Sequence, residues 1–355
     1  MGRVSNWSSK NARIRAKIGL LSSPSKYSKI AGSTFEHACV DLKTEPPSGI
    51  EFDDTTDFQN TLSSSLYKCY ENHLVLVGKI LDGKYKNVFF TALEETIIND
   101  IKHLIRRIAL GHNDQTREKA RYIALNNSKL LKNFSNISDM TDLDEALKGT
   151  PFHKPFKLAR STFMQGGNIL GFEIALDRDF HSRLHKTLKT LPEPDKTISG
   201  RLFRKLCDIK NLLWILRYKF NYQLTEVEIF NYAIDEGFEL NDGIIKKLAK
   251  ASTTGEFISI LSFLNCGKFI IKSLKGNTTS PSVISIEDSL AKYREKLLHG
   301  SLTTSPFGLA PFLAYLWLKM LEKDRYERII TGLDLQFPVE DILESLNLHK
   351  EVSIV

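Results

Sequence analysis

Apolar residues recur every three or four positions through most of this chain, which is the spacing of amphipathic helices. One such segment carries Leu62, Leu66, Cys69, Tyr70, Leu74 and Val77, and the next carries Phe89, Leu93, Ile97, Ile101, Leu104 and Ile108. Strand-like alternation between apolar and polar residues is confined to two short stretches, 75–77 and 163–172. The pattern therefore predicts an all-α fold.

The helical pattern is itself repeated along the chain. An Asp-Ile-Lys-x-Leu motif occurs at Asp100 and again at Asp208, and an earlier helix of each repeat carries Leu66, Leu176 or Leu290. The motif spacing is 108 residues, and the leucine spacings are 110 and 114. A repeat of constant length indicates that one structural unit occurs several times.

Local signals mark several helix ends. Pro192 and Pro194 end one helix, and we expect the next helix to begin at Asp208. Thr225 and the acidic residues after it suit the start of a short helix, because their side chains accept bonds from free backbone N–H groups. Residues 338–342 repeat this pattern near the end of the chain.

The last repeat lacks its closing helix, which the N-terminus supplies. The closing helices of the first two repeats are expected to begin near Thr141 and Thr254, and the matching threonine for the third repeat is Thr34. Stacked repeats normally expose apolar faces at both ends. Joining the two termini in one unit predicts a closed, pseudo-threefold ring with a central concavity. Its units are residues 58–170, 171–282, and 283–355 together with 1–57.

Composition and charge narrow the class of protein to which the chain can belong. Of the 355 residues 42% are hydrophobic and 26% charged, which is typical of a soluble globular protein, and no apolar run approaches the ~20 residues of a spanning helix. The four cysteines form no C-x-x-C pair, so no disulfide framework or zinc site is indicated. The net charge of +7 comes from residues 1–35, which hold seven Lys and Arg and no acid. This basic segment suits a solvated helix face, a transit peptide, a nucleic-acid arm or a helix facing an acidic partner.

The sequence contains few candidate catalytic or metal-binding residues. His181 and His185 share a helix face and could ligate a metal, but no third ligand is evident beside them. The glycine-rich segment 165–171 matches neither phosphate-binding motif and suits a connector between two repeats. We expect no cofactor, no metal site and no catalytic residue.

Four segments resemble one known family. They are Asn-Ala-Arg-Ile-Arg from Asn11, Ala-Leu-Asp-Arg-x-Phe from Ala175, the two Asp-Ile-Lys helices, and Pro-Phe-Gly-Leu-x-Pro-Phe-Leu-Ala-Tyr-Leu-x-x-Lys from Pro306. In order and spacing they are similar to the C subunit of the V/A-type rotary ATPases, the counterpart of the d subunit of the eukaryotic enzymes. The resemblance extends from about residue 10 to residue 346.

The resemblance implies a funnel-shaped protein that catalyses nothing itself. Such a protein lies on the cytoplasmic face of the membrane proteolipid (c) ring, as a peripheral part of the complex, and receives the foot of the central rotor stalk. It thereby couples ATP hydrolysis or synthesis to ion transport. On this interpretation, acidic stalk residues would meet the basic side chains Arg13, Arg15 and Lys17, and in the second unit Arg217 and Lys219.

Two other functions remain open at this point. A helical-repeat adaptor could bind nucleic acid through the basic N-terminal arm, and its binding would fall steeply with salt. That interpretation leaves the repeat spacing unexplained, and we expect no nucleic-acid partner. A metalloenzyme built on His181 and His185 is the third alternative, and it requires bound metal.

Overall fold

The computed structural model describes residues 3–47, 50, 58–110, 137–163, 169–274 and 278–346, and every regular element within these ranges is a helix. This confirms the predicted all-α class. Residues 75–77, one of the two strand-like stretches, lie in helix α4 (Phe58–Gly78). Among the described residues, no helix combines the length and the hydropathy needed to cross a bilayer.

The helices form two compact units, Met1–Phe180 with Tyr315–Val355, and His181–Ala314. The boundary passes through the two helices α9 (Leu170–Leu188) and α16 (Ala310–Asp334). Besides α4 and parts of these two, the first unit contains α1 (Arg3–Ile18), α2 (Pro24–Ala31), α3 (Phe35–Thr44), α5 (Gly83–Leu110), α7 (Met140–Leu147), α8 (His153–Phe163) and α17 (Val339–Ser345).

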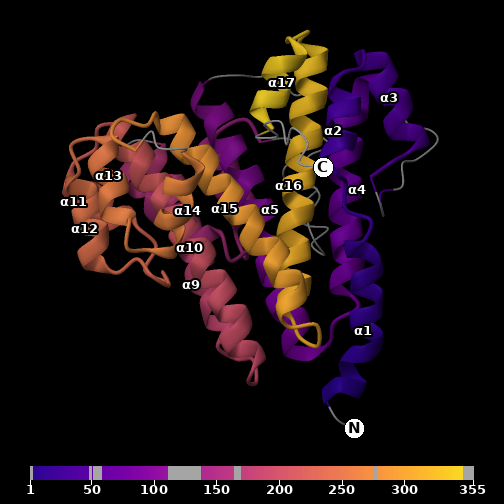
Figure 1. The fold of residues 1–355 in the computed structure, drawn as a ribbon, viewed down its shortest axis with the longest axis horizontal. Coiled ribbons are helices and arrows are strands. Elements are labelled where there is room, and N and C mark those ends of the chain that lie inside the picture. The colour runs from indigo at the N-terminus through magenta and orange to yellow at the C-terminus, as the bar shows by residue number, and fades with distance from the viewer. Residues whose placement is uncertain are drawn as a thin grey trace. The chain divides into compact units, whose positions relative to one another are not determined.

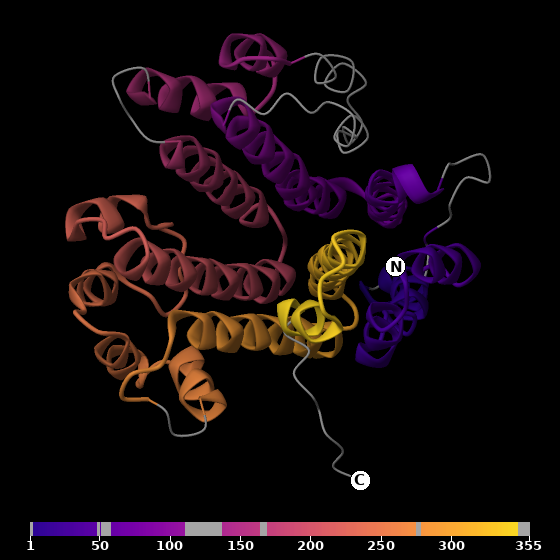
Figure 2. The same cartoon turned by 90° about the horizontal axis from the view of Figure 1, so that it is seen from above.

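In the first unit the N-terminal helices share a core with the C-terminal ones. Helix α2 lies beside α16 and contacts α17 directly, and α3 packs against α2; they are the indigo and yellow ribbons in Figures 1 and 2. Their buried side chains form one cluster, which includes Tyr27, Ile30, Cys39, Leu42, Tyr326, Ile329 and Ile342. The N-terminal and C-terminal helices therefore share one core, and the grouping of the N-terminus with the last repeat stays a prediction.

The second unit is built around a pair of long helices. Helix α10 (Asp195–Phe220) packs along α15 (Val283–Thr304), as both views show. Four shorter helices complete the unit: α11 (Glu226–Tyr232), α12 (Asp242–Lys250), α13 (Thr254–Leu261) and α14 (Asn265–Ser273). They pack in sequence order, and α14 also contacts α15.

Equivalent turns occur where the long helices of the second and third repeats end. Gln223 after α10 and Gln336 after α16 both have positive φ, at 53° and 57°. A residue in this left-handed conformation is a common way to end a helix. Two residues later, Thr225 and Pro338 occupy the N-cap positions of α11 and α17. The similarity between residues 225–229 and 338–342 therefore extends to the backbone.

The expected unit starts coincide with helix starts. Helices α4, α9 and α15 begin at Phe58, Leu170 and Val283, each at the expected residue or next to it. They contain 21, 19 and 22 residues, and each is followed by a longer helix of 28, 26 or 25 residues. The grouping of these helices into three units of one ring stays a prediction.

One expected helix start is wrong, and another is off by one residue. Helix α10 begins at Asp195, directly after Pro194, so the motif at Asp208 lies in its interior. The proline marks the true start, because its fixed φ suits the first turn of a helix and not its interior. Helix α7 begins at Met140, next to the expected Thr141, and the carboxylate of Asp139 caps it by accepting bonds from two backbone N–H groups.

Candidate partner-binding site

The basic N-terminal helix α1 is anchored by one face. Trp7 and Ile14 are 2% and 0% exposed, and the Trp7 ring meets the edge of Tyr85 with centroids 4.9 Å apart. The ammonium of Lys10 lies 2.6 Å from the Asp82 carboxylate. Burial of this face fixes which basic side chains the helix presents on its other face.

The predicted partner-binding residues of α1 differ in their surroundings. Arg13 is exposed and makes no ion pair within the described part of the chain. Arg15 is also exposed, and its Nε donates a 3.3 Å bond to Asn11 Oδ1 on the same helix. Lys17 is half-buried. Arg13 and Lys17 are four residues apart and so share one side of α1.

Of the two predicted partner-binding residues of the second unit, Arg217 is bound to a carboxylate within the chain. The guanidinium of Arg217 on α10 binds both carboxylate oxygens of Glu287 on α15, at 2.6 and 3.1 Å. These bonds raise the pKa of Arg217 above its usual value. Lys219 is half-buried near the end of the same helix. The Arg217 charge is therefore largely compensated before any partner arrives.

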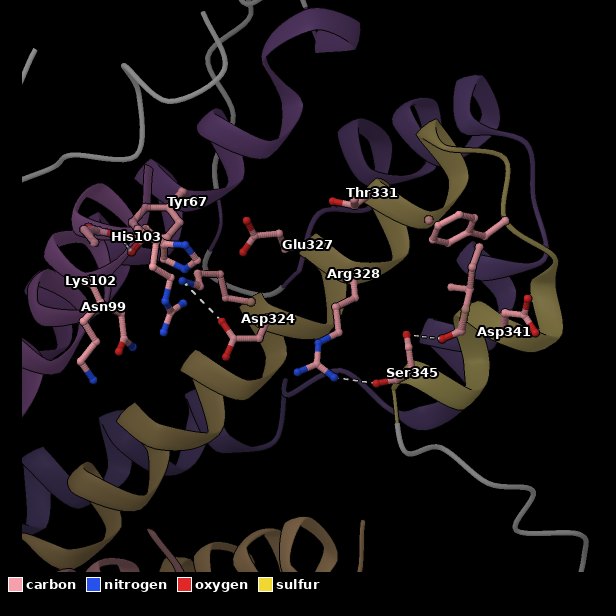
Figure 3. Close-up of a pocket in the computed structure, with 16 residues that line it drawn as sticks. Tyr67, Asn99, Lys102, His103, Asp324, Glu327, Arg328, Thr331, Asp341 and Ser345 are labelled. Carbon is pink, nitrogen blue, oxygen red and sulfur yellow. Dashed lines mark hydrogen bonds and ion pairs between the residues drawn. The ribbon is translucent and has the colours of Figure 1, made fainter. Parts of the chain in front are cut away.

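A pocket of about 610 Å³ lies in the first unit and is lined mainly by α5, α16 and α17. We call it the α16–α17 pocket. Its charged side chains are Asp100, Lys102, His103, Arg106, Lys323, Asp324, Glu327, Arg328 and Asp341. Both acidic and basic groups line it (Figure 3). Such a recess suits polar contacts and attracts neither sign of charge strongly.

Many charged side chains of the α16–α17 pocket already have partners within the chain. Arg328 Nη1 donates a 2.6 Å bond to the Ser345 carbonyl, drawn as a dashed line in Figure 3. The Lys323 ammonium lies 3.5 Å from Asp324 Oδ1 and 3.8 Å from the centre of the Tyr67 ring. The Tyr67 hydroxyl in turn donates a 2.5 Å bond to Asp100. These bonds hold α4, α5, α16 and α17 together around the pocket.

Glu71 lies buried close to this network. Burial raises the pKa of its carboxyl well above the usual value, and repulsion from Asp100 raises it further, while Lys323 opposes the shift. The native state therefore favours the protonated form of Glu71. A neutral carboxyl there avoids placing two negative charges side by side in the interior.

Residues of both Asp-Ile-Lys motifs make buried contacts that hold the fold together. Lys102, from the first Asp-Ile-Lys motif, forms a buried ion pair with Asp177 of the Ala-Leu-Asp-Arg segment, 75 residues away. Asp208, from the second motif, accepts backbone N–H bonds from Phe238, Glu239 and Leu240 at 2.8 to 3.2 Å. Local sequence reasoning recognised both motifs, but it contained no signal for the distant partners.

A second buried pair was also missed from the sequence. Lys319 and Glu322 on α16 are 0% and 2% exposed, with Nζ and Oε2 2.9 Å apart. Glu322 also accepts a 2.7 Å bond from the hydroxyl of Ser22, which lies 300 residues earlier. The sequence feature that could have revealed this pair is two opposite charges three residues apart, directly after the apolar run 312–318.

The two histidines of the metal hypothesis stack on an aromatic ring. Both lie against Phe203, with ring centroids 5.8 Å away for His181 and 6.2 Å away for His185. Burial lowers the pKa of His185. Within the described residues, no group of three or more His, Cys, Asp or Glu side chains could hold a metal ion. The glycine-rich residues 165–168 lie outside the described ranges.

These observations define a helical scaffold whose buried charges join distant segments and whose first helix presents exposed arginines. The sequence model of the ATP synthase (C/AC39) subunit family matches residues 10–345, and the chain belongs to that family. This confirms the resemblance to the C subunit of the V/A-type enzymes and the expectation of a structural rather than a catalytic role.

Two similar proteins are both named as the C subunit of an A-type ATP synthase. The one from Methanosphaera stadtmanae is 24% identical over 323 residues, which cover 88% of this chain and 80% of the relative. The one from Methanocaldococcus jannaschii is 26% identical over 331 residues, which cover 91% of this chain and 81% of the relative. The similarity thus spans most of both chains.

Proposed function

We propose that this chain is the non-catalytic central-rotor subunit that links the stalk of a V/A-type ATPase or ATP synthase to its membrane proteolipid ring. In this role it lies on the cytoplasmic face of the ring and receives the foot of the stalk. It thereby couples ATP hydrolysis or synthesis to the transport of H⁺ or Na⁺. The observation that carries the proposal is the family match over residues 10–345.

A rotor socket has to be stiff and has to hold two partners, but it needs no reactive group. Stiffness is supported by buried polar links between segments that are far apart in sequence, such as Lys102 with Asp177 and Ser22 with Glu322. Such links fix the relative positions of packed helices because a buried charge without its partner is costly. The shared core of α2, α3, α16 and α17 supports the proposed ring of three units and its funnel-shaped cup.

We assign the stalk-facing role chiefly to Arg13 and Arg15. Both are exposed, neither is paired with a carboxylate of the described residues, and residues 1–35 contain no acid that could compensate them. Lys17 and Lys219 are half-buried and would contribute at the edge of such a contact. Arg217 would have to share its guanidinium with Glu287, so we expect it to contribute least.

The test is direct binding to the isolated stalk subunits of the same complex, measured by biolayer interferometry with the full chain. The double variant Arg13→Glu/Arg15→Glu should weaken binding roughly tenfold or more, since each exposed pair contributes up to about 1 kcal/mol and reversal adds repulsion. The matched control is Lys157→Glu/Lys250→Glu, which makes the same charge change at exposed lysines of α8 and α12.

Each outcome bears on a separate part of the proposal. Equal affinity for the double variant and the control would remove Arg13 and Arg15 from the interface. Failure of the wild-type chain to bind either the stalk subunits or the detergent-solubilised ring would overturn the rotor assignment. Binding of nucleic acid instead, with a steep dependence on salt, would favour the adaptor function.

A further inference from the structure

A second pocket lies wholly within the second compact unit, between α10 and α15. Its volume is about 380 Å³, and we call it the α10–α15 pocket. On α10 it is lined by Ile198, Arg201, Leu202 and Lys205, and on α15 by Tyr293, Lys296, Leu297, Gly300, Ser301 and Thr304. Spacings of three and four residues place each set on a single face of its helix.

The charges lining the α10–α15 pocket are all positive. Arg201, Lys205 and Lys296 line it, and none of its lining residues is acidic. None of the three makes an ion pair within the described part of the chain. The Lys205 and Lys296 ammonium groups lie over aromatic rings, 5.4 Å from the centre of Phe238 and 5.2 Å from that of Phe269. A cation–π contact orients an ammonium without neutralising it.

This arrangement differs from that of the α16–α17 pocket, which both acidic and basic groups line. Three cations around one recess, none of them in an ion pair with the described residues, create a positive potential there. Because like charges on neighbouring helices repel, the site carries an electrostatic cost that a bound anion would remove. The pocket is therefore suited to a negatively charged ligand.

The remaining wall of the pocket is apolar. Leu202 and Ala310 are buried, and Ile198 and Leu297 are half-buried at its surface. Gly300 leaves room in the wall, since a Cβ atom added there would meet nothing within 4 Å. Pockets that combine an apolar wall with a few polar groups and a volume of roughly 300–1,000 Å³ typically bind small molecules. The matching ligand has an anionic head and a short apolar part.

We propose that the α10–α15 pocket binds an amphipathic phosphate ester, whose phosphate contacts Arg201, Lys205 and Lys296 and whose apolar part lies against Ile198, Leu202 and Leu297. Three separate cationic donors match the several oxygens and the double charge of a phosphate better than they match one carboxylate. A soluble phosphate ester and the headgroup of an anionic phospholipid share this chemistry. The site is independent of the stalk-binding role of α1.

Isothermal titration calorimetry on the full chain tests this proposal. The probe is dihexanoyl phosphatidic acid, used below its micelle concentration, with inorganic phosphate as the head-only comparison. We expect saturable binding of one equivalent, tighter for the ester than for inorganic phosphate. Arg201→Gln/Lys296→Gln should weaken it about a hundredfold, a factor of about ten for each cation removed. Lys157→Gln/Lys250→Gln, at exposed lysines of α8 and α12 outside the pocket, is the charge-matched control and should leave it unchanged.

A space-filling variant separates a shaped pocket from general attraction to a basic surface. Gly300→Phe places a ring in the open part of the wall, keeps all three cations and should abolish binding. Gly300→Ala is its control. It should retain binding and raise helix stability slightly, because alanine is the better helix former. Equal circular dichroism spectra for the two variants would show that loss of binding is not loss of fold.

Vesicles distinguish the two sources of the phosphate. Flotation with phosphatidylcholine vesicles that contain phosphatidic acid, if blocked by Gly300→Phe, identifies a lipid headgroup as the ligand. Binding of the soluble ester without flotation identifies a free phosphate ester. Absence of saturable ester binding would overturn the proposal. So would affinities that are equal for ester and inorganic phosphate, or equal for Gly300→Phe and Gly300→Ala.

Discussion

Removing the Lys319 charge should destabilise the first compact unit severely. Lys319 is fully buried, and its ammonium lies 2.9 Å from Glu322 Oε2 and 5.2 Å from the centre of the Tyr70 ring. Glu322 is also held by Ser22, whose hydroxyl accepts a 2.9 Å bond from Tyr326. Methionine would fill much of the space of the lysine, so Lys319→Met chiefly removes the positive charge and leaves the Glu322 carboxylate without its cation.

The expected magnitude follows from the burial of both partners. Removing one partner of a buried ion pair costs about 3–5 kcal/mol, because the remaining charge stays desolvated and uncompensated. That is a large part of the roughly 5–15 kcal/mol by which folded proteins are stable. The double variant Lys319→Met/Glu322→Leu removes both charges, so we expect it to recover most of the loss.

The measurement is urea-induced unfolding of four proteins: wild type, Lys319→Met, Glu322→Leu and the double variant. Trp317 is a local fluorescent probe, since it lies on the same helix and its indole N–H donates a 3.0 Å bond to Glu95. A coupling energy of several kcal/mol in the double-mutant cycle is the expected result. A loss below about 1 kcal/mol for Lys319→Met would refute the reasoning, as would a double variant no more stable than the single one.

Two further predictions concern buried carboxylates. Because the folded state raises the pKa of Glu71 above its usual 4.5, the stability it contributes is lost as pH rises through the folded-state value. Glu71→Gln should therefore unfold at a higher temperature than wild type at about pH 8 but not at about pH 4, and equal pH profiles of Tm would contradict this. Asp208→Ala leaves three backbone N–H groups without their acceptor and should cost about 3 kcal/mol in urea unfolding, against well under 1 kcal/mol for the exposed control Asp242→Ala.

Helices and their caps were predictable because their signals are local. The capping interaction between Thr225 and Glu228 is present in both directions, with the Glu228 carboxylate 2.9 Å from the Thr225 N–H. Periodicity likewise located α4 and the part of α5 from Phe89 to Ile108. The start of α10 expected at the Asp-Ile-Lys motif is wrong, because Pro194 marks the true start.

The surroundings of the charged residues were not predictable in the same way. Arg13 and Arg217 are equivalent in the sequence, as basic residues on helices, and both are exposed, yet only Arg217 is bound to a carboxylate of the described residues, that of Glu287, 70 residues away. Ion pairs of this kind depend on which helices pack together. Neither helical periodicity nor local charge patterning contains that information.

The segments that carry the family resemblance are largely those that hold the scaffold together. Lys102, Asp177, Asp208 and Lys319 all belong to such segments, and each is buried with a partner from another part of the chain or of its own helix. Buried pairs add little net stability over apolar residues, but they penalise any arrangement that separates them. The proposed role, that of a rotor part that transmits torque, requires this property more than it requires a high free energy of unfolding.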